Sequence, residues 1–316
     1  MGVRSLPRLL LIAGLMFISG CVSVGDTPPA AEPQASAPQP PACVGQLLRK
    51  VLVTAFPLRY PEQLRPGEYM DWAQTTGAEL ARQMGATGRV RVAAAPEDFA
   101  FTEATAAPAV ERDARGEPRI VEWARRERAQ YVLAGVFKDF GTAHKWQVLP
   151  ERQISLEIFL YDGIDGRLLS RRAFDRQLML DGDLPKAVIP GTRAFADSRL
   201  GRAYYALLAD IGQWATDEIA CRPFPLRIVR VEGRQLHLDA GSDSGLAAGA
   251  ALSTTTRPQL VMAGGSLNRR QMPMATIVQV GPDSSTAEVP EQRVPPKFSV
   301  GGILYVPDKQ PSITDK

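Results

Sequence analysis

The chain has 316 residues, a formal net charge of +3, 45% hydrophobic residues, three cysteines and two histidines. Length and hydrophobic content are enough for two folded domains. The near balance of acidic and basic residues gives no indication of a nucleic-acid partner, and we expect none.

Residues 1–20 have the layout of a secretory signal peptide. Arg4 and Arg8 precede the apolar run Leu9–Ile18, which is shorter than the roughly 20 residues of a permanent membrane span. The next residues, Ile18-Ser19-Gly20-Cys21, resemble the bacterial lipobox, in which the cysteine thiol accepts diacylglycerol before a peptidase cleaves on its N-terminal side. We therefore predict cleavage before Cys21 and acylation of that residue, palmitate included. An ordinary signal peptide or an uncleaved anchor is the alternative.

The residues after the cleavage site indicate where the chain is held. Val22 follows Cys21, whereas aspartate at this position is the familiar signal for inner-membrane retention in enterobacteria. The resemblance thus implies a lipid anchor at the periplasmic face of the outer membrane. Residues 21–43 are rich in Pro, Ala, Gln and Ser, so we predict a disordered tether. At about 3.1 Å per residue in polyproline II, it would reach roughly 60 Å.

Cys43 and Cys221 are the two thiols that remain once Cys21 carries lipid. In an oxidising compartment we predict that they form a disulfide, with two separate free thiols as the alternative. The chain contains no C-x-x-C sequence, which argues against thiol–disulfide catalysis.

Residues 44–222 have the pattern of an α/β domain. Apolar runs and alternating apolar residues predict strands, and apolar residues at helical spacing predict helices. The predicted strands are 51–56, 90–92, 131–137, 154–160 and 168–174, and the predicted helices lie around 69–84, 119–128 and 204–219. Gly85 stands where a helix C-terminal cap is expected, and Asp162–Gly166 should form a hairpin turn.

Residues 223–316 show only short strands separated by glycine and proline, which favours a small β-barrel or sandwich. The predicted strands are 226–231, 235–238, 251–255, 276–280, 286–289 and 303–306. Residues 261–274, rich in Gly, Met and Arg, are predicted to form a long exposed loop.

The sequence predicts no catalytic, cofactor or metal site. His144 and His237 have no partner at metal-ligand spacing. Residues 241–245, Gly-Ser-Asp-Ser-Gly, have an aspartate where a nucleophile elbow needs its nucleophile, so we interpret them as a turn. Asp162 and Asp165 lack the ligand register of an EF-hand loop. The arginines 125, 126, 128, 171 and 172 are interpreted as solvated faces.

The order of motifs in the first domain carries a resemblance to a known fold. The strand 51–56, the segment 129–135 (Ala-Gln-Tyr-Val-Leu-Ala-Gly) and the hairpin 154–169 resemble the TolB N-terminal-like fold of curli-secretion and penicillin-binding-protein-activator lipoproteins. The implied fold class is a TolB N-terminal-like, anticodon-binding-like α/β domain followed by a small all-β barrel-like domain.

With the β module marked by Gly241–Leu246 and Gly249–Leu252, the order resembles the middle and C-terminal domains of the flagellar assembly protein T family. This implies a non-enzymatic periplasmic ring or scaffold component, with flagellar basal-body or ring proteins as partners and a possible homo-oligomeric ring. Family members that build rings carry a further N-terminal domain, where this chain has a lipid signal and tether. The alternatives are a regulator of a peptidoglycan synthase or an export system, and a hydrolase with an unrecognised site.

Overall fold

The computed structural model describes residues 47–60, 68–95, 116, 118–139, 142–143, 151–179, 190–220, 222–254, 261–263, 266–268, 274–291 and 298–307. The predictions about the signal peptide, Cys21, the tether, Cys43, Cys221 and His144 lie outside these residues.

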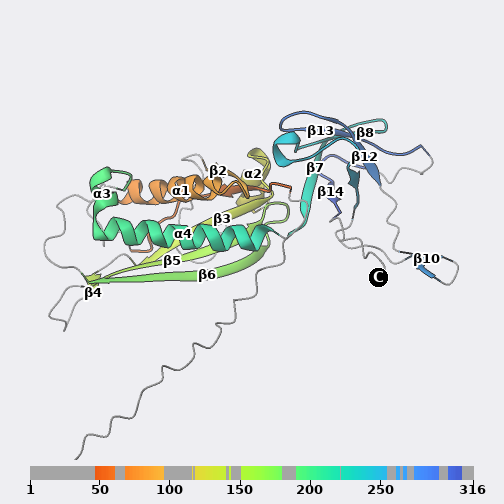
Figure 1. Ribbon diagram of the computed structural model, residues 1–316. Helices are drawn as coiled ribbons and strands as arrows, with labels where there is room; N and C mark the ends of the chain where they lie inside the picture. The colour runs from red at the N-terminus through yellow and green to blue at the C-terminus, as the bar shows by residue number, and fades with distance from the viewer. Residues whose placement is uncertain are drawn as a thin grey trace, which may run out of the picture. The chain divides into compact units, whose positions relative to one another are not determined.

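The first part of the chain forms a mixed six-stranded sheet (Figure 1). Its strands are β1 (Lys50–Val53), β2 (Arg91–Ala94), β3 (Tyr131–Asp139), β4 (Thr142–Ala143), β5 (Glu151–Asp162) and β6 (Leu168–Met179). β1 lies between β2 and β3 and is parallel to both. β5 is antiparallel to β3, β4 and β6. The parallel pairs follow from helical crossovers, and the antiparallel β5–β6 pair from a tight turn.

That turn is built by its own side chains. Asp162 Oδ1 accepts a hydrogen bond from the Ile164 amide at 2.8 Å, and Asp165 Oδ1 accepts one from the Arg167 amide at 2.9 Å. Gly166 has a φ of +73°, a conformation that side chains disfavour. The predicted Asp162–Gly166 turn is confirmed.

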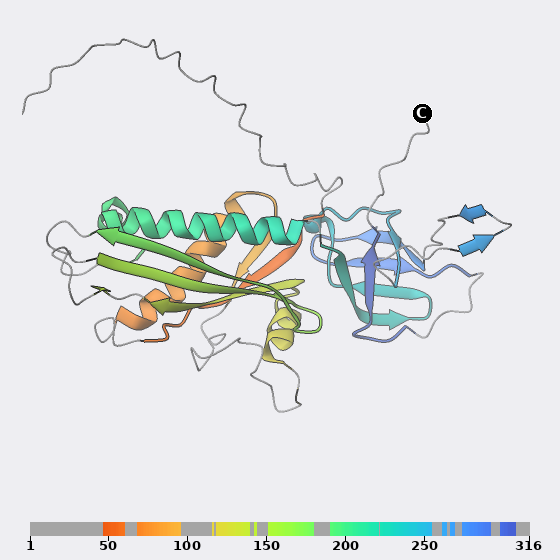
Figure 2. The ribbon, with the colours of Figure 1, turned by 90° about the horizontal axis from the view of Figure 1, so that it is seen from below.

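Helices cover both faces of this sheet. The helices are α1 (Glu68–Ala86), α2 (Arg119–Arg126), α3 (Arg193–Asp197) and α4 (Arg199–Ala220). α1 and α4 contribute to the core that contains Val53, Leu133 and Leu156, while α2 contributes to a second core with Leu52 and Val132. Successive strand residues therefore face opposite helical layers, as the continuous apolar run of β3 requires. Figure 2 shows α4 along the strands at one side of the sheet.

Aromatic side chains fix how α1 and α4 pack. Trp72 makes edge-on contacts with Phe195 at 5.5 Å and Tyr204 at 5.4 Å between ring centroids. Tyr204 donates a hydrogen bond to Thr76 Oγ1 at 2.8 Å, which satisfies its buried hydroxyl. Burial raises the pKa of the Tyr204 hydroxyl, so this group stays protonated.

The second part of the chain forms a six-stranded antiparallel sheet that curls into a barrel. Its order is β14 (Ile303–Val306), β7 (Phe224–Glu232), β8 (Gln235–Leu238), β13 (Ser285–Glu288), β12 (Ala275–Val280) and β9 (Ala251–Leu252). A single bridge between Ser253 and Tyr305 joins the two end strands. It contains two backbone hydrogen bonds, of 2.9 and 2.7 Å. The core holds mostly Leu, Ile and Ala.

The segment before β1 contacts the barrel as well as the α/β sheet. The Leu48 amide donates to the Ser244 carbonyl at 2.9 Å, and Leu47 packs on the barrel core. Arg49 Nε donates to the Arg222 carbonyl at 2.8 Å. The stretches of chain that follow Cys43 and Cys221 are thus joined directly.

The predicted elements differ from the structure at several ends. α1 continues past Gly85 to Ala86, and the positive φ lies at Gly88. α2 ends at Arg126 because Arg128 adopts a φ of +52°. The predicted long loop 261–274 contains a short hairpin of β10 (Val261–Ala263) and β11 (Ser266–Asn268), so the prediction of a loop was wrong for these residues. The interpretation of residues 241–245 as a turn is confirmed, with Gly245 at a φ of +81°.

Candidate partner-binding groove

The strand β6 is a long edge of the α/β sheet. Its residues Leu168–Met179 pair with β5, and in the part of the chain that the structure describes no other strand pairs with them. An edge strand presents a row of backbone donors and acceptors along its outer side. This side of β6 is therefore a place where a further strand could add.

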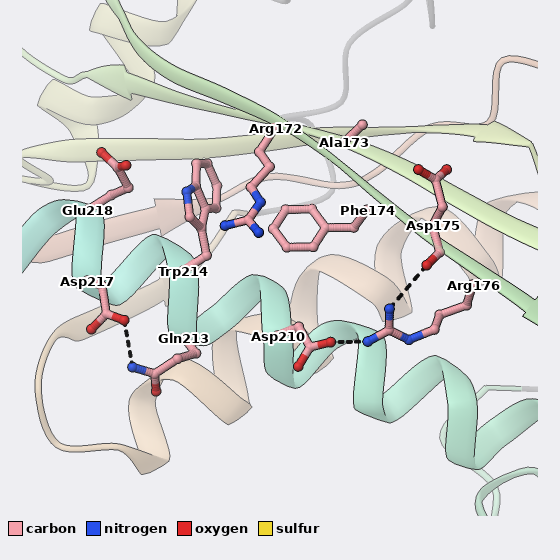
Figure 3. Close-up of a pocket in the computed structure, with 10 residues that line it drawn as sticks. All are labelled: Arg172, Ala173, Phe174, Asp175, Arg176, Asp210, Gln213, Trp214, Asp217 and Glu218. Carbon is pink, nitrogen blue, oxygen red and sulfur yellow. Dashed lines mark hydrogen bonds and ion pairs between the residues drawn. The ribbon is translucent and has the colours of Figure 1, made fainter. Parts of the chain in front are cut away.

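A groove of about 690 Å³ runs between β6 and α4 (Figure 3). Arg172, Phe174 and Arg176 line it from the strand, and Asp210, Trp214 and Asp217 line it from the helix. Because side chains alternate along a strand, positions 172, 174 and 176 share one face. On α4, positions 210, 213, 214 and 217 share one face by helical spacing.

The strand register confirms which face this is. Arg172, Phe174 and Arg176 lie opposite Ile158, Leu156 and Ile154 of β5, whose side chains belong to the core under α4. The three β6 residues therefore point toward the helical layer. Phe174 is buried there, and its ring meets Trp214 edge-on at 5.7 Å.

Most charges in the groove are paired within the chain. Arg176 forms an ion pair with Asp210. Arg89 reaches Asp217 at 2.9 Å, and Arg222 reaches Glu218 at 3.0 Å.

Arg172 is different, because its guanidinium lies over the Phe174 ring at 5.0 Å and no described carboxylate forms an ion pair with it. The groove therefore retains one exposed positive charge beside aromatic surface.

On the opposite face of the β5–β6 pair, polar side chains of the two strands contact one another. Arg171 Nε donates to Glu157 Oε1 at 2.7 Å, and its guanidinium covers the Phe159 ring at 5.4 Å. Ser155 Oγ donates to Asp175. Arg171 and Arg172 are adjacent in sequence but lie on opposite faces, and both are exposed, as the interpretation of these arginines as solvated residues requires.

The residues singled out from the sequence have structural contacts. His237 Nε2 lies 3.1 Å from Glu232 Oε2 across the β7–β8 hairpin, and this hydrogen bond lowers the pKa of Glu232. Arg128 pairs with Asp283 at 2.5 Å. Burial raises the pKa of Asp162.

The described residues include no group of three or more His, Cys, Asp or Glu arranged to hold a metal ion. No helix among them is long and apolar enough to span a membrane.

A buried ion pair lies in the barrel wall. Arg227 Nε is 3.9 Å from Asp239 Oδ2, and each side chain is about one-tenth exposed. Asp239 Oδ1 also accepts the Arg227 amide at 2.8 Å. Burial raises the pKa of Asp239, while the Arg227 amide and guanidinium act in the opposite direction. Arg227 Nη2 reaches the Gly163 carbonyl at 3.4 Å, so the pair also contacts the β5–β6 turn.

The α/β sheet with helices on both faces, followed by the antiparallel barrel, defines an α/β plus β-barrel protein, and the groove between β6 and α4 is lined by charged residues. Residues 42–181 match the family model of the flagellar assembly protein T middle domain. This match supports the resemblance to the flagellar assembly protein T family found in the sequence.

Several solved structures are similar to part of this chain at low sequence identity. A PelC dodecamer from Paraburkholderia phytofirmans is 18% identical and covers 56% of this chain and 91% of its own, with a TM-score of 0.34. The hypothetical protein CT253 from Chlamydia trachomatis is 13% identical, covers 55% and 99%, and has a TM-score of 0.41. Lipoprotein GNA1162 from Neisseria meningitidis is 14% identical, covers 52% and 99%, and has a TM-score of 0.31. No curated protein sequence matches the chain.

Proposed function

We propose that this chain is a non-enzymatic, lipid-anchored outer-membrane protein that acts in flagellar assembly, as a scaffold or ring component at the basal body. The match of residues 42–181 to the flagellar assembly protein T middle domain carries this proposal. The groove between β6 and α4 supports it, because its paired charges and open edge strand suit contacts with a protein.

The N-terminal sequence supplies the anchoring part of the proposal. Ile18-Ser19-Gly20-Cys21 has lipobox order, and residues 22–42 form a Pro-rich stretch before the folded domains. Buried acyl methylenes contribute about 0.8 kcal/mol each, so several chains on Cys21 would hold the protein at the membrane. The tether would let the folded domains reach partners away from the membrane surface.

A deletion strain tests the flagellar role directly. We expect loss of swimming and incomplete basal bodies in electron micrographs, both restored by the wild-type chain. The Cys21→Ser chain, produced at the same level, should restore swimming poorly because it is not anchored. A deletion strain with normal basal bodies and normal swimming would overturn the proposal. Altered peptidoglycan or impaired export, with intact flagella, would instead favour the regulatory or export alternative.

A second test separates binding from catalysis. Single alanine substitutions at exposed Asp, Glu, His and Ser should leave swimming nearly unchanged, because few residues dominate a binding interface. Removal of residues 225–316, or a proline within α4, should abolish swimming. One conservative polar substitution that eliminates function in a folded, anchored protein would support a hydrolase.

A further inference from the structure

We propose that the outer edge of β6 and the groove beside it bind an extended, acidic segment of a partner protein, which adds to the sheet as a further strand. The inference deepens the proposed function and rests on it for the role of that partner. Three features of β6 and α4 carry it: the open backbone edge, the shape of the groove, and the charge that the groove leaves unpaired.

The first feature is the length of the edge. Eleven residues of β6 are in register with β5, from Leu168 to Met179, while the opposite side of the strand has no partner among the described residues. Strand addition uses such an edge, because main-chain hydrogen bonds supply affinity and alternate side chains supply specificity. A long exposed edge strand can also pair with unrelated strands and cause aggregation. Proteins with such an edge strand therefore usually carry features that limit which strands can pair with it.

The second feature is the position of the groove. It follows β6 from Arg172 to Arg176 and is bounded by α4 from Asp210 to Glu218, so it lies along the edge rather than across the sheet. Figure 3 shows the strand and helix side chains facing each other over it. Side chains on one face of an added strand would enter this hollow, next to Phe174 and Trp214.

The third feature is the charge of Arg172. Asp210, Asp217 and Glu218 are already paired with Arg176, Arg89 and Arg222. The fourth carboxylate of the lining, Asp175, accepts a hydrogen bond from Ser155 on the opposite face of the sheet. Arg172 forms a cation–π contact with Phe174 and no ion pair with a described carboxylate. A carboxylate on the added strand would supply the missing counter-charge, whereas a basic strand would be repelled. Arg172 thus selects an acidic segment and discourages pairing with other strands.

Designed peptides test this inference on the full-length protein in detergent. The probe is a labelled ten-residue peptide of alternating Val and Glu, followed by fluorescence anisotropy. We expect it to bind at least about tenfold more tightly than the alternating Val and Lys peptide, because only its charge complements Arg172. A Val and Glu peptide with proline at every second valine should bind at least about tenfold more weakly, because proline cannot donate to a strand ladder.

Variants place the binding site. Arg172→Glu should weaken binding of the acidic peptide by at least about tenfold, as a like-charge contact replaces an opposite-charge one. Arg193→Glu is the matched control, because Arg193 is 96% exposed on α3 and lies outside the groove, so binding should change less than about twofold. Circular dichroism spectra of both variants should match the wild type.

Several outcomes would overturn the inference. They are failure of the acidic peptide to bind the wild type, equal binding of the acidic and basic or proline-containing peptides, and equal loss in both variants. Sedimentation that shows a dimer of the full chain, dissociated by Arg172→Glu, would assign the edge to a second copy instead. A non-motile deletion strain combined with a failed peptide test would reject this inference and leave the proposed function intact. A motile deletion strain would reject the proposed function whatever the peptides do.

Discussion

The close approach of α1 to the chain after β1 makes a quantitative prediction for Gly77→Ala. The Phe56 amide donates to the Ala73 carbonyl of α1 at 2.9 Å, so helix and strand end are in direct backbone contact. A Cβ atom at Gly77 would lie 2.3 Å from the Thr54 carbonyl oxygen and 3.1 Å from its carbon. Thr54 is fully buried, and its backbone cannot yield without disturbing the hydrogen bond from its amide to Leu133.

The expected cost follows from this contact. Overpacking of an interior costs about 1–3 kcal/mol, and the upper part of that range, about 2–3 kcal/mol, applies here because the added Cβ clashes with buried backbone. Alanine offsets up to about 1 kcal/mol of this cost, because its helix propensity is higher than that of glycine. The net loss in free energy of unfolding should be about 1–2 kcal/mol, and the melting temperature should fall by about 2–8 °C. Thermal unfolding followed by circular dichroism measures the shift.

Gly85→Ala is the matched control, because Gly85 lies in the same helix with no atom within 4 Å of its added Cβ. This variant should be as stable as the wild type or more stable, by up to about 1 kcal/mol. If Gly77→Ala unfolds at or above the wild-type temperature, α1 does not pack against Thr54 as described, and the reasoning fails.

The remaining predictions concern the cysteines and the buried ion pair. Non-reducing gels of alkylated protein should show a Cys43–Cys221 disulfide; two freely alkylated thiols would contradict it. A palmitate analogue should label the wild type but not Cys21→Ser, and label retained in that variant would contradict lipidation. Asp239→Ala should lower the urea-measured free energy of unfolding by about 3 kcal/mol or more, because it leaves the buried Arg227 charge without its carboxylate; a loss below about 1 kcal/mol would argue against that burial. Because burial raises the pKa of Asp239, the folded protein keeps that proton to a higher pH than the unfolded chain. The contribution of this group to stability therefore falls as pH rises from the ordinary aspartate pKa of 3.8 through the raised pKa of the folded state. Urea midpoints at a series of pH values should show this slope in the wild type and not in Asp239→Asn.

The local sequence pattern was sufficient to predict the helices and strands whose apolar residues follow one pattern along their whole length. The apolar residues of α4 recur at helical spacing and are the ones the structure buries. The continuous apolar run of β3 marks a strand covered on both faces, as observed. β6 was predicted too short because Asp175, Arg176 and Gln177 show no apolar alternation. Their strand conformation depends on pairing with β5.

The groove was not predicted because it depends on contacts between distant segments. Residues 172–176 and 210–218 are brought together by packing of α4 on the sheet, which no single stretch of sequence specifies. One signal was present: Arg172, Phe174 and Arg176 share a strand face, as do Asp210, Trp214 and Asp217 on a helix. The adjacent arginines 171 and 172 suggest one cluster in the sequence, but a strand places consecutive side chains on opposite faces.

The single bridge that closes the barrel has a kinetic consequence. All other neighbouring strand pairs of that sheet share a ladder, whereas Ser253 and Tyr305 share two hydrogen bonds between segments far apart in sequence. Contacts between residues this far apart in sequence form after local hairpins, because closing a long loop costs conformational entropy before the contact stabilises the chain. The barrel should therefore close after the β7–β8 hairpin has formed, and amide hydrogens at Ser253 and Tyr305 should exchange with solvent earlier than those of that hairpin.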